Sequence, residues 1–569
     1  MTRHAAAFLA LFIAATSLAP ASDVSDVADA RRLFESNLDA IRRRDREAYL
    51  ACYLDSETFA RTGPEGPQRG FAAHAEQSAK DPWPDVFEGH DLELVPIRPG
   101  VVYGTYRYRV RYGAGDEHIG ISERLFLDTK KGWKIAVTTA FEASASTPPP
   151  PVALVGGTLL DGKGGSPVAD AVIVLRGGKI DCAGPRSACP VPEGLETMDM
   201  KGLFVTPGLI DAHVHFSQTG WADGRPDSID LRETFPYEEL QAKLRGNPGR
   251  FLRSYLCSGV TSVFDVGGYP WTWDLRARAE SDTAGPRVAA AGPLLTTLDH
   301  WLNLPAERQF IYLVDPNAAR AGVHYLAAHG TDAVKVWFIN NPARGFDEME
   351  GAVGAAGEEA RARHLRLIVH ATGLKEAKAS LRAGANLLVH SVWDAPLDDE
   401  FIDLAKRNGT IYCPTLTVID GYFRMFQSVV SGTPPVVDDP GQCVDAETLD
   451  HVASTPKAAA GKADAASLAR FSDRDARHDT MAANLRRVRD AGIPIAMGTD
   501  AGNPLTLHGP SIFAEMEAME AAGLTADEVL HAATSGGARA MGREKDLGTV
   551  EAGKAADLLV VAADPSVTV

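Results

Sequence analysis

His213 and His215 stand one residue apart, in the stretch D-A-H-V-H that follows the apolar run L-F-V-T-P-G-L-I. Side chains alternate between the two faces of a strand, so the two imidazoles would point the same way from neighbouring pleats. Two imidazoles on one side can bind one metal ion. The alternative is a strand end with two ordinary buried histidines, and the pair alone does not decide between these readings.

Four further residues of ligand type lie in or at the end of apolar runs. Lys335 lies in D-A-V-K-V-W, His370 ends L-R-L-I-V-H, His390 ends A-N-L-L-V-H, and Asp500 ends I-P-I-A-M-G-T-D. Barrel enzymes place their chemistry at the C-terminal ends of strands. Each residue alone has a structural explanation, because a histidine can be structural and a lysine can snorkel. Their joint occurrence is hard to explain as core packing.

Three longer stretches contain or accompany these residues: V-T-P-G-L-I-D-A-H-V-H, G-T-D-A-G and the tail D-L-G-T-V-E-A-G-K-A-A-D-L-L-V-V. With these motifs, the chain from about residue 152 onward resembles the amidohydrolase superfamily. The resemblance is strongest to its imidazolonepropionase-like and prolidase-like branch. It implies an α/β fold, a distorted (β/α)₈ TIM barrel with a small flanking β-sandwich. It also implies that His213 and His215 hold one metal ion with Asp500, that His370 and His390 hold a second, and that Lys335 bridges the two as a carboxylated lysine.

Elementary chemistry agrees with the implied metal site. A lysine in a dry barrel near divalent cations prefers its neutral amine, because burial and like charge both disfavour the ammonium form, and a neutral amine can react with carbon dioxide. Nitrogen and oxygen ligands without thiolate suit zinc, with manganese or cobalt as alternatives. A metal-activated hydroxide would attack a carbonyl carbon, and Asp500 would carry the proton to the leaving nitrogen.

We therefore expect an exported metal-dependent amidohydrolase that cleaves C–N bonds of an amide, cyclic amide or dipeptide-like small molecule. One alternative is a mononuclear deaminase or ring-opening hydrolase in which Lys335 is not carboxylated. Another is a non-catalytic binding or scaffold protein that uses its N-terminal domain. Metal content per chain separates the first alternative from the binuclear enzyme.

Loops at the C-terminal face of the barrel provide the candidate substrate contacts. T-T-L-D-H-W contains His300 and Trp301, and N-P-L-T-L-H-G contains His508. Trp337 either lines the pocket or packs in the core. Asp211, just before the histidine pair, either orients a ligand from behind or serves a turn. The segment from 423 to 477 carries no family motif and is either a helical cap over the pocket or a loosely ordered surface.

The ends of the chain and its overall charge set further bounds. The N-terminus predicts a cleavable signal peptide over residues 1–21, because Arg3 is followed by a short apolar run and by A-P-A. We therefore expect a secreted or periplasmic protein without a membrane span in the mature chain. The alternative is an uncleaved N-terminal anchor. A net charge of −18 argues against a nucleic-acid partner. The sequence stops at A-D-P-S-V-T-V, where relatives of this kind continue, so the second part of the sandwich is either small or incomplete.

Export also permits disulfides. Cys182 and Cys189 could close a short loop, whereas Cys52, Cys257, Cys413 and Cys443 are expected as buried free thiols.

Length and sequence pattern predict several domains, beginning with a region over 23–145 and a Pro-rich linker over 146–151. The resemblance to the amidohydrolase superfamily implies a first sandwich part over 152–206, the barrel over 207–545 and a second sandwich part over 546–569. The N-terminal region resembles the NTF2-like (SnoaL-like) α+β fold. Its run V-V-Y-G-T-Y-R-Y-R-V-R-Y predicts a half-buried strand, with three arginines on a face that either binds an anion or pairs with acids. Tyr106, Tyr108 and Tyr112 would line either a ligand cavity or, as we favour, a self-association surface of a homodimer or higher homo-oligomer.

Overall fold

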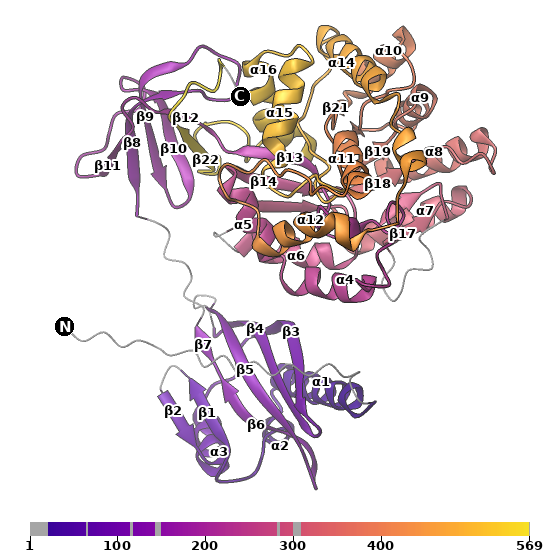
Figure 1. Cartoon of the computed structure of the whole chain (residues 1–569). Coiled ribbons are helices and arrows are strands. Elements are labelled where there is room, and N and C mark those ends of the chain that lie inside the picture. The colour runs from indigo at the N-terminus through magenta and orange to yellow at the C-terminus, as the bar shows by residue number, and fades with distance from the viewer. Residues whose placement is uncertain are drawn as a thin grey trace. The chain divides into compact units, whose positions relative to one another are not determined.

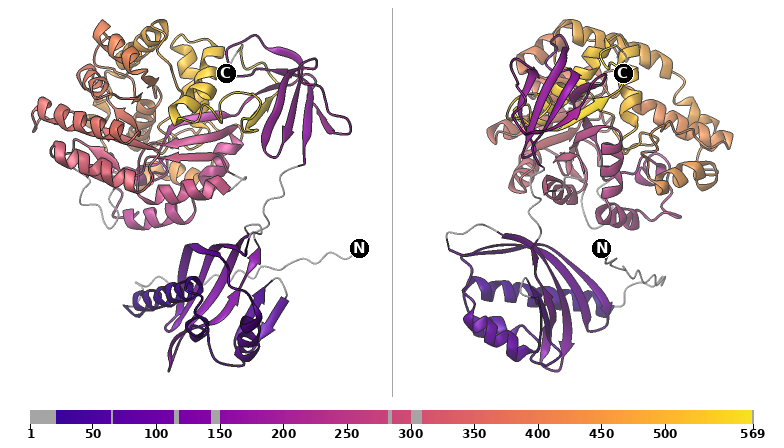
Figure 2. Two further views of the ribbon diagram at one scale, coloured as in Figure 1. Left: turned by 180° about the vertical axis from the view of Figure 1, so that it is seen from behind. Right: turned by 90° about the vertical axis from the view of Figure 1, so that its left-hand side faces the viewer.

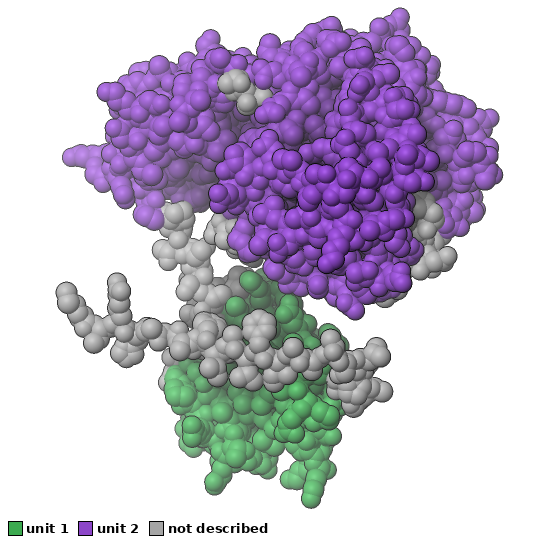
Figure 3. All heavy atoms as spheres, in the orientation of Figure 1, with its two compact units in different colours: residues 1–149 green, residues 150–569 purple. Residues whose placement is uncertain are grey.

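The computed structural model describes residues 21–63, 66–113, 118–142, 150–281, 285–299 and 309–567. The chain separates into two compact units, residues 1–149 (unit 1) and 150–569 (unit 2), which Figure 3 draws in different colours. The boundary falls within the Pro-rich run predicted as a linker. Residues 1–20 of the predicted signal peptide and residues 146–149 of that linker lie outside the described residues.

Unit 1 is a curved, mostly antiparallel sheet with helices on one face (Figures 1 and 2). The strand order is β2-β1-β6-β5-β4-β3, and β7 pairs with β5. Helix α1 packs on this sheet through apolar residues three and four positions apart, as an amphipathic helix does. Its elements are α1 (Ala21–Arg42), α2 (Arg46–Ala51), β1 (Ala60–Gly63), β2 (Gly66–Arg69), α3 (Phe71–Lys80), β3 (Val86–Arg98), β4 (Val101–Arg111), β5 (His118–Thr129), β6 (Gly132–Thr139) and β7 (Phe141–Glu142).

Strand β4 has the alternating burial that its sequence predicts. Tyr106 and Tyr108 are 3% and 7% exposed and belong to the core of unit 1. The arginines of the opposite face pair with acids, for example Arg109 with Glu88 at 2.9 Å. A self-association surface built on these two tyrosines is therefore wrong, because their rings face inward. Only Tyr112, beyond the end of the strand, is exposed, at 48%.

Unit 2 begins with a sheet that joins the two ends of its sequence (Figure 1). The order is β10-β9-β8-β12-β22, with β11 on β8; β12 is parallel to β8 and antiparallel to β22. The predicted first and second sandwich parts thus share one sheet. Its strands are β8 (Val152–Leu159), β9 (Val168–Arg176), β10 (Lys179–Pro185), β11 (Glu196–Asp199), β12 (Phe204–Pro207) and β22 (Leu558–Val561).

The rest of unit 2 alternates parallel strands with helices, as the apolar runs predict. One sheet has the order β13-β14-β15 and another β17-β16-β18-β19-β20-β21. The strands are β13 (Leu209–Val214), β14 (Val260–Asp265), β15 (Arg287–Ala290), β16 (Leu294–Thr296), β17 (Phe310–Tyr312), β18 (Ala333–Trp337), β19 (Arg366–His370), β20 (Leu387–Val389) and β21 (Ile411–Cys413).

Helices surround these strands on their outer side (Figures 1 and 2). They are α4 (Tyr237–Gly246), α5 (Gly249–Cys257), α6 (Trp271–Ser281), α7 (Pro316–Ala328), α8 (Phe346–Ala362), α9 (Leu374–Arg382), α10 (Asp399–Asn408), α11 (Val418–Ser431), α12 (Ala446–Ala458), α13 (Ala465–Ala469), α14 (Arg474–Asp490), α15 (Ser511–Ala521), α16 (Ala526–His531) and α17 (Gly537–Met541). Two short helices accompany them, the 3₁₀ helix η1 (Ala222–Gly224) and the π-helix η2 (Ala532–Gly536). None of the helices in the described part of the chain is both long and apolar enough to cross a membrane.

The segment 494–501 connects the two parallel sheets through backbone hydrogen bonds. The amide of Tyr412 in β21 donates to the carbonyl of Pro494 at 2.8 Å, and the amide of Ala212 in β13 donates to the carbonyl of Met497 at 3.0 Å. The same segment contains Asp500, so it brings that carboxylate beside His213 and His215.

Two disulfides are present among the described cysteines. Cys182 pairs with Cys189 as expected, whereas the expectation that Cys257 and Cys443 are free thiols is wrong, because they pair with each other. Cys257 ends α5, and Cys443 lies in the connection before α12, which packing brings beside it. Cys52 and Cys413 are buried free thiols, as predicted.

The segment 423–477, for which the sequence left two readings, is largely helical. We call residues 418–490, which contain α11 to α14, the cap segment. Its helices pack through their own apolar cluster, which includes Phe426 and Val452 and also takes in Trp221 from the loop after β13. A packed cluster of this kind excludes the loosely ordered surface.

Candidate metal centre and pocket

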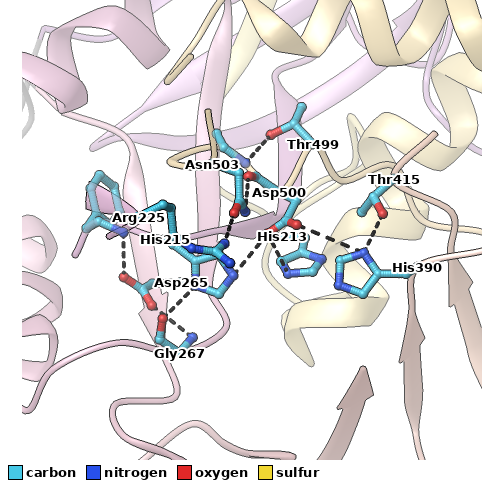
Figure 4. A network of polar contacts seen from close by, with 12 residues as sticks. His213, His215, Arg225, Asp265, Gly267, His390, Thr415, Thr499, Asp500 and Asn503 are labelled. Carbon is cyan, nitrogen blue, oxygen red and sulfur yellow. Dashed lines mark hydrogen bonds and ion pairs between the residues drawn. The ribbon is translucent and has the colours of Figure 1, made fainter. Parts of the chain in front are cut away.

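Two histidines and one carboxylate form the core of the site (Figure 4). His213 and His215 project from the end of β13, and Asp500 follows the segment 494–499. Nε2 of His213 lies 3.2 Å from Oδ1 of Asp500, and Nε2 of His215 lies 3.0 Å from the same oxygen. One ligand atom from each of the three residues lies within 4.8 Å of the other two. The spacing suits a single cation held by all three.

The partners of these atoms fit a metal ion. Nδ1 of His215 is 2.6 Å from the carbonyl oxygen of Gly267, which leaves Nε2 facing Asp500. Both ring nitrogens of His213 and Oδ1 of Asp500 are buried without a hydrogen-bond partner in the described residues. Buried polar atoms without partners are costly, and a cation between them would satisfy all three side chains.

A second set of residues lies next to the first. The rings of His370 and His390 are 4.3 Å apart, and the ring of His390 is 4.9 Å from that of His213. Nδ1 of His390 pairs with Oγ1 of Thr415 at 2.7 Å, so its Nε2 is left for a ligand. Lys335 on β18 is only 2% exposed and makes no hydrogen bond or ion pair with the described residues.

Burial controls the protonation of the site. It lowers the pKa of His213, His370 and His390 well below the ordinary value, with nearby Lys335 acting in the same direction, so these imidazoles are neutral and can coordinate a metal. Burial also lowers the pKa of Lys335 to about 8. For Asp500 burial acts upward, but contact with His215 and the charges of His390 and Lys335 outweigh it, so its pKa is lowered.

The backbone is shaped to aim these side chains. His390 and Asp500 have φ angles of 74° and 62°, in the left-handed region that few residues other than glycine adopt. Such conformations persist only where the surrounding structure holds them, and they cluster at functional sites. At Gly498, an added Cβ would lie 2.6 Å from Sγ of Cys413 and 2.8 Å from Cβ of His213. Only glycine allows the segment 494–501 to pass so close to His213.

Two buried carboxylates brace the site from behind. Asp211 accepts hydrogen bonds from the amides of His213 (3.2 Å) and Thr499 (3.0 Å) and from the Thr499 hydroxyl (2.6 Å). It therefore orients a ligand's backbone and not an imidazole ring. Asp265, which the sequence reasoning missed, accepts from the amides of Phe216 and Gly267, both at 3.0 Å. It ends the apolar run V-T-S-V-F-D, the same signal that identified His370.

The ligand-type residues open into a cavity of about 430 Å³. His215, Lys335, His370, His390 and Asp500 line its floor. The cap segment contributes aromatic and basic walls, so this part of the chain is a cap, the first of the two readings. Other lining residues include Arg225, Asp227, Tyr237, Phe310, Trp337, Trp393, Tyr422, Phe426, Arg470, Phe471, Arg477 and Asn503.

The predicted substrate contacts have different outcomes. Trp337 lines the cavity, with its ring stacked on Phe310 at 5.4 Å. The prediction for His508 is wrong: it is 3% exposed, lies 4.1 Å from the ring of Phe251, and its ring nitrogens pair with Tyr255 and Gln218. The His508 side chain packs among aromatic rings in the core and does not line the cavity. His300 and Trp301 lie outside the described residues.

Sequence reasoning also missed a cluster of polar residues beside Asp500, formed by Arg225, Tyr422 and Asn503. Arg225 forms a paired contact with Asp227 at 2.7 and 2.9 Å and a hydrogen bond with Asn503. Tyr422 donates to Oδ1 of Asn503 at 2.7 Å, and Asn503 donates to the carbonyl of Asp500 at 3.0 Å. These residues come from three separate loops or helices, and no spacing in the sequence links them.

Comparison with known proteins identifies a family for most of unit 2. The family model described as the amidohydrolase family matches residues 204–569. An imidazolonepropionase of Caulobacter vibrioides (strain NA1000 / CB15N) is 26% identical over 426 residues, which are 69% of this chain and 88% of that protein. A 5-methylthioadenosine/S-adenosylhomocysteine deaminase of Symbiobacterium thermophilum is 26% identical over 72% of this chain and 84% of that protein.

A solved structure gives the same picture. The crystal structure of a Xaa-Pro dipeptidase with bound methionine in its active site is 25% identical, with a TM-score of 0.54. The match covers 73% of this chain and 95% of that one. The similarity therefore spans most of each relative.

Proposed function

This chain belongs to the amidohydrolase family, and on that basis we propose that it is a metal-dependent hydrolase of C–N bonds in amides, cyclic amides or dipeptide-like molecules. The group formed by His213, His215 and Asp500 is the observation that carries the proposal. Both ring nitrogens of His213 and Oδ1 of Asp500 are buried without a hydrogen-bond partner in the described residues, and a bound cation would satisfy them.

The proposed centre holds two divalent ions. His213, His215 and Asp500 would bind one, and His370 and His390 would bind the other. Lys335, buried and with a lowered pKa, would join them as a carboxylated lysine. The nitrogen and oxygen donors favour zinc, with manganese or cobalt as alternatives. When bound, the ions would supply Lewis-acid activation of water and of the scissile carbonyl group.

The protein's own residues would handle the proton and the substrate. Asp500 is within reach of both histidines of the first group, so it is placed to accept a proton from the attacking water and deliver it to the leaving nitrogen. Asn503, held by Arg225 and Tyr422, fixes the backbone of Asp500. The aromatic walls of the cavity would exclude bulk water and strengthen these polar contacts.

The relatives suggest the substrate class. Their names describe an imidazolonepropionase, a deaminase and a Xaa-Pro dipeptidase. The second candidate function, a mononuclear deaminase or ring-opening hydrolase, is supported by the compact group of His213, His215 and Asp500, which could hold one ion without the other three residues. In that case Lys335 would be an uncarboxylated amine.

The finer points of architecture are also proposals. We propose that the two parallel sheets, with the segment 494–501 between β21 and β13, form one distorted (β/α)₈ TIM barrel over 207–545. The sheet of 152–206 and 546–569 would be the flanking β-sandwich, and residues 23–145 an NTF2-like domain. Export as a secreted or periplasmic protein is supported by the two disulfides. A homodimer or higher homo-oligomer stays a prediction.

The test is to load the purified protein with zinc, manganese or cobalt and to assay dipeptides, N-acyl amino acids, lactams and aminated heterocycles. Metal content is measured in the same samples. Turnover of an amide with two equivalents of metal per chain would support the binuclear hydrolase. Full activity with one equivalent, and ammonia as the product, would favour the deaminase. Protein that binds metal and turns over none of these classes would refute both.

A further inference from the structure

Unit 1 contains a cavity of its own, of about 370 Å³. It lies between the concave face of the sheet and the helices, and its volume is in the range of small-molecule sites. Seven aromatic residues contribute to its wall: Tyr49, Tyr53, Trp83, Phe87, Tyr106, Tyr108 and Tyr112. Several of these rings meet edge to face, for example Tyr49 with Tyr53 at 5.0 Å, so the wall is preformed.

A buried guanidinium lines this aromatic cavity. Arg124 of β5 is 3% exposed, and its Nη2 donates to the hydroxyl of Tyr106 at 2.8 Å. Its Nε and Nη1 have no hydrogen-bond partner in the described residues. The charge lies over the rings of Tyr106 and Phe34, at 4.8 and 5.3 Å, and forms no ion pair with a described carboxylate. An unpaired buried charge destabilises a fold, so its retention points to a ligand that pairs with it.

The rest of the lining adds positive charge. Arg46 donates to Oγ of Ser78 and to the carbonyl of Asp81, and Arg61 makes no hydrogen bond or ion pair with the described residues. Asp81 is the single acid among the described lining residues, against three arginines. The cavity therefore favours an anion.

A second buried polar side chain faces the same space. His74 is 1% exposed, and neither of its ring nitrogens has a partner in the described residues. Burial lowers its pKa to about 4, so the ring is neutral at pH 7 and offers one donor and one acceptor. It can therefore bind a hydroxyl or carbonyl substituent.

We propose that unit 1 binds a small aromatic monocarboxylate, with the carboxylate on Arg124 and the ring among the cavity's tyrosines. Carboxylates match the planar pair of N–H groups that a guanidinium presents, and a flat ring fits between aromatic walls. The inference uses only residues of unit 1 and does not depend on the proposed hydrolase activity.

The experiment uses the whole mature chain and isothermal titration calorimetry. The probes are benzoate, its neutral isostere benzamide, and acetate, which lacks the ring. We expect benzoate to bind at least about tenfold more tightly than either of the others, since both the charge-assisted pair and the ring contact are required. Equal binding of benzoate and benzamide, or no binding of benzoate, would overturn the proposal.

Variants then locate the site. Arg124→Met should abolish benzoate binding while unit 1 stays folded, because methionine fills the space without a charge. Arg109→Gln is the matched control: it removes an arginine from the neighbouring strand, on the opposite face of the sheet, and should bind as wild type does. If Arg124→Met does not fold, Arg124→Lys keeps the charge without the planar donor pair and should still weaken benzoate. Unchanged binding in the folded Arg124 variant would place benzoate elsewhere and refute the site.

Discussion

The carboxylate of Asp211 accepts a 2.6 Å hydrogen bond from the hydroxyl of Thr499, although the two residues are 288 positions apart in the sequence. Asp211 precedes the histidine pair, and Thr499 precedes Asp500. The bond therefore joins the two chain segments that supply His213, His215 and Asp500, the group that could bind a metal ion.

The first prediction concerns this bond. In Asp211→Ala two buried amides, those of His213 and Thr499, lose their acceptor, which should cost about 2 to 4 kcal/mol of unfolding free energy and reduce metal content. Asp211→Asn is the matched control, because its amide oxygen can still accept both bonds. Denaturant unfolding and metal analysis check the result. Equal stability and metal content in the alanine variant would show that the brace is dispensable.

The second prediction concerns Lys335. If it joins two ions as a carboxylated lysine, Lys335→Ala should lose metal and activity, and added acetate or propionate should restore part of both by filling the gap. The neutral variant Lys335→Met keeps the volume but leaves no gap, so it should lose metal without rescue. Normal metal content and rate in Lys335→Ala would assign the lysine a structural role.

The third prediction concerns Asp500. Asp500→Asn should lower turnover by about 10² to 10⁴-fold, as expected for a positioned acid–base group, while KM changes little. Metal content must be measured in the same sample, because Asp500 is also a proposed ligand. Wild-type turnover in this variant would refute both roles.

The fourth prediction concerns the disulfide that fastens the cap segment. Cys257 and Cys443 enclose a sequence separation of 186 residues, for which the chain-entropy model gives a stabilisation of about 5 kcal/mol. The double variant to serine should unfold more easily and raise KM, because Tyr422, Phe426 and Phe471 of the cap line the pocket.

Cys182→Ser with Cys189→Ser provides the comparison. This pair spans only 7 residues in a sheet that does not line the pocket, so its loss should reduce stability less and leave KM as it was. An unchanged KM in the first double variant would mean that packing alone holds the cap.

The fifth prediction is a pH dependence of unit 1. His74 has a pKa of about 4 in the folded state and about 6.5 when unfolded, so between these values the unfolded state binds more protons. Stability should therefore fall as the pH drops from 6.5 towards 4, by roughly 3 kcal/mol from this group. In His74→Phe that part of the pH dependence should vanish, as followed by thermal unfolding. A variant whose profile parallels wild type would exclude His74 as the cause.

Sequence reasoning reached the residues that follow strand periodicity. A parallel strand is buried on both faces, so it reads as an apolar run, and polar residues stand out in it or at its end. This pattern identified Lys335, His370, His390 and Asp500. The structure brings all of them to one cavity.

Sequence reasoning did not predict features that depend on how separate segments of the chain pack together. The pairing of Cys257 with Cys443 needs α5 beside the cap segment, and nothing in their spacing reports that. Arg225 and Tyr422 join at Asn503 from different loops and helices. His508 looked like a pocket residue because it follows Asp500, but the rings of Phe216 and Phe251 draw it inward.

The pairing of β12 with β22 has a consequence for the order of synthesis. Val205 lies opposite Val560, so the sheet that starts unit 2 cannot gain strand β22 until the ribosome has made about 350 further residues. The same holds for the group of His213, His215 and Asp500, whose carboxylate is translated long after its histidines. Unit 1, by contrast, is complete before any of this begins. A nascent chain can therefore fold its first unit early, whereas the group of His213, His215 and Asp500 can assemble only after the segment up to Asp500 has been made.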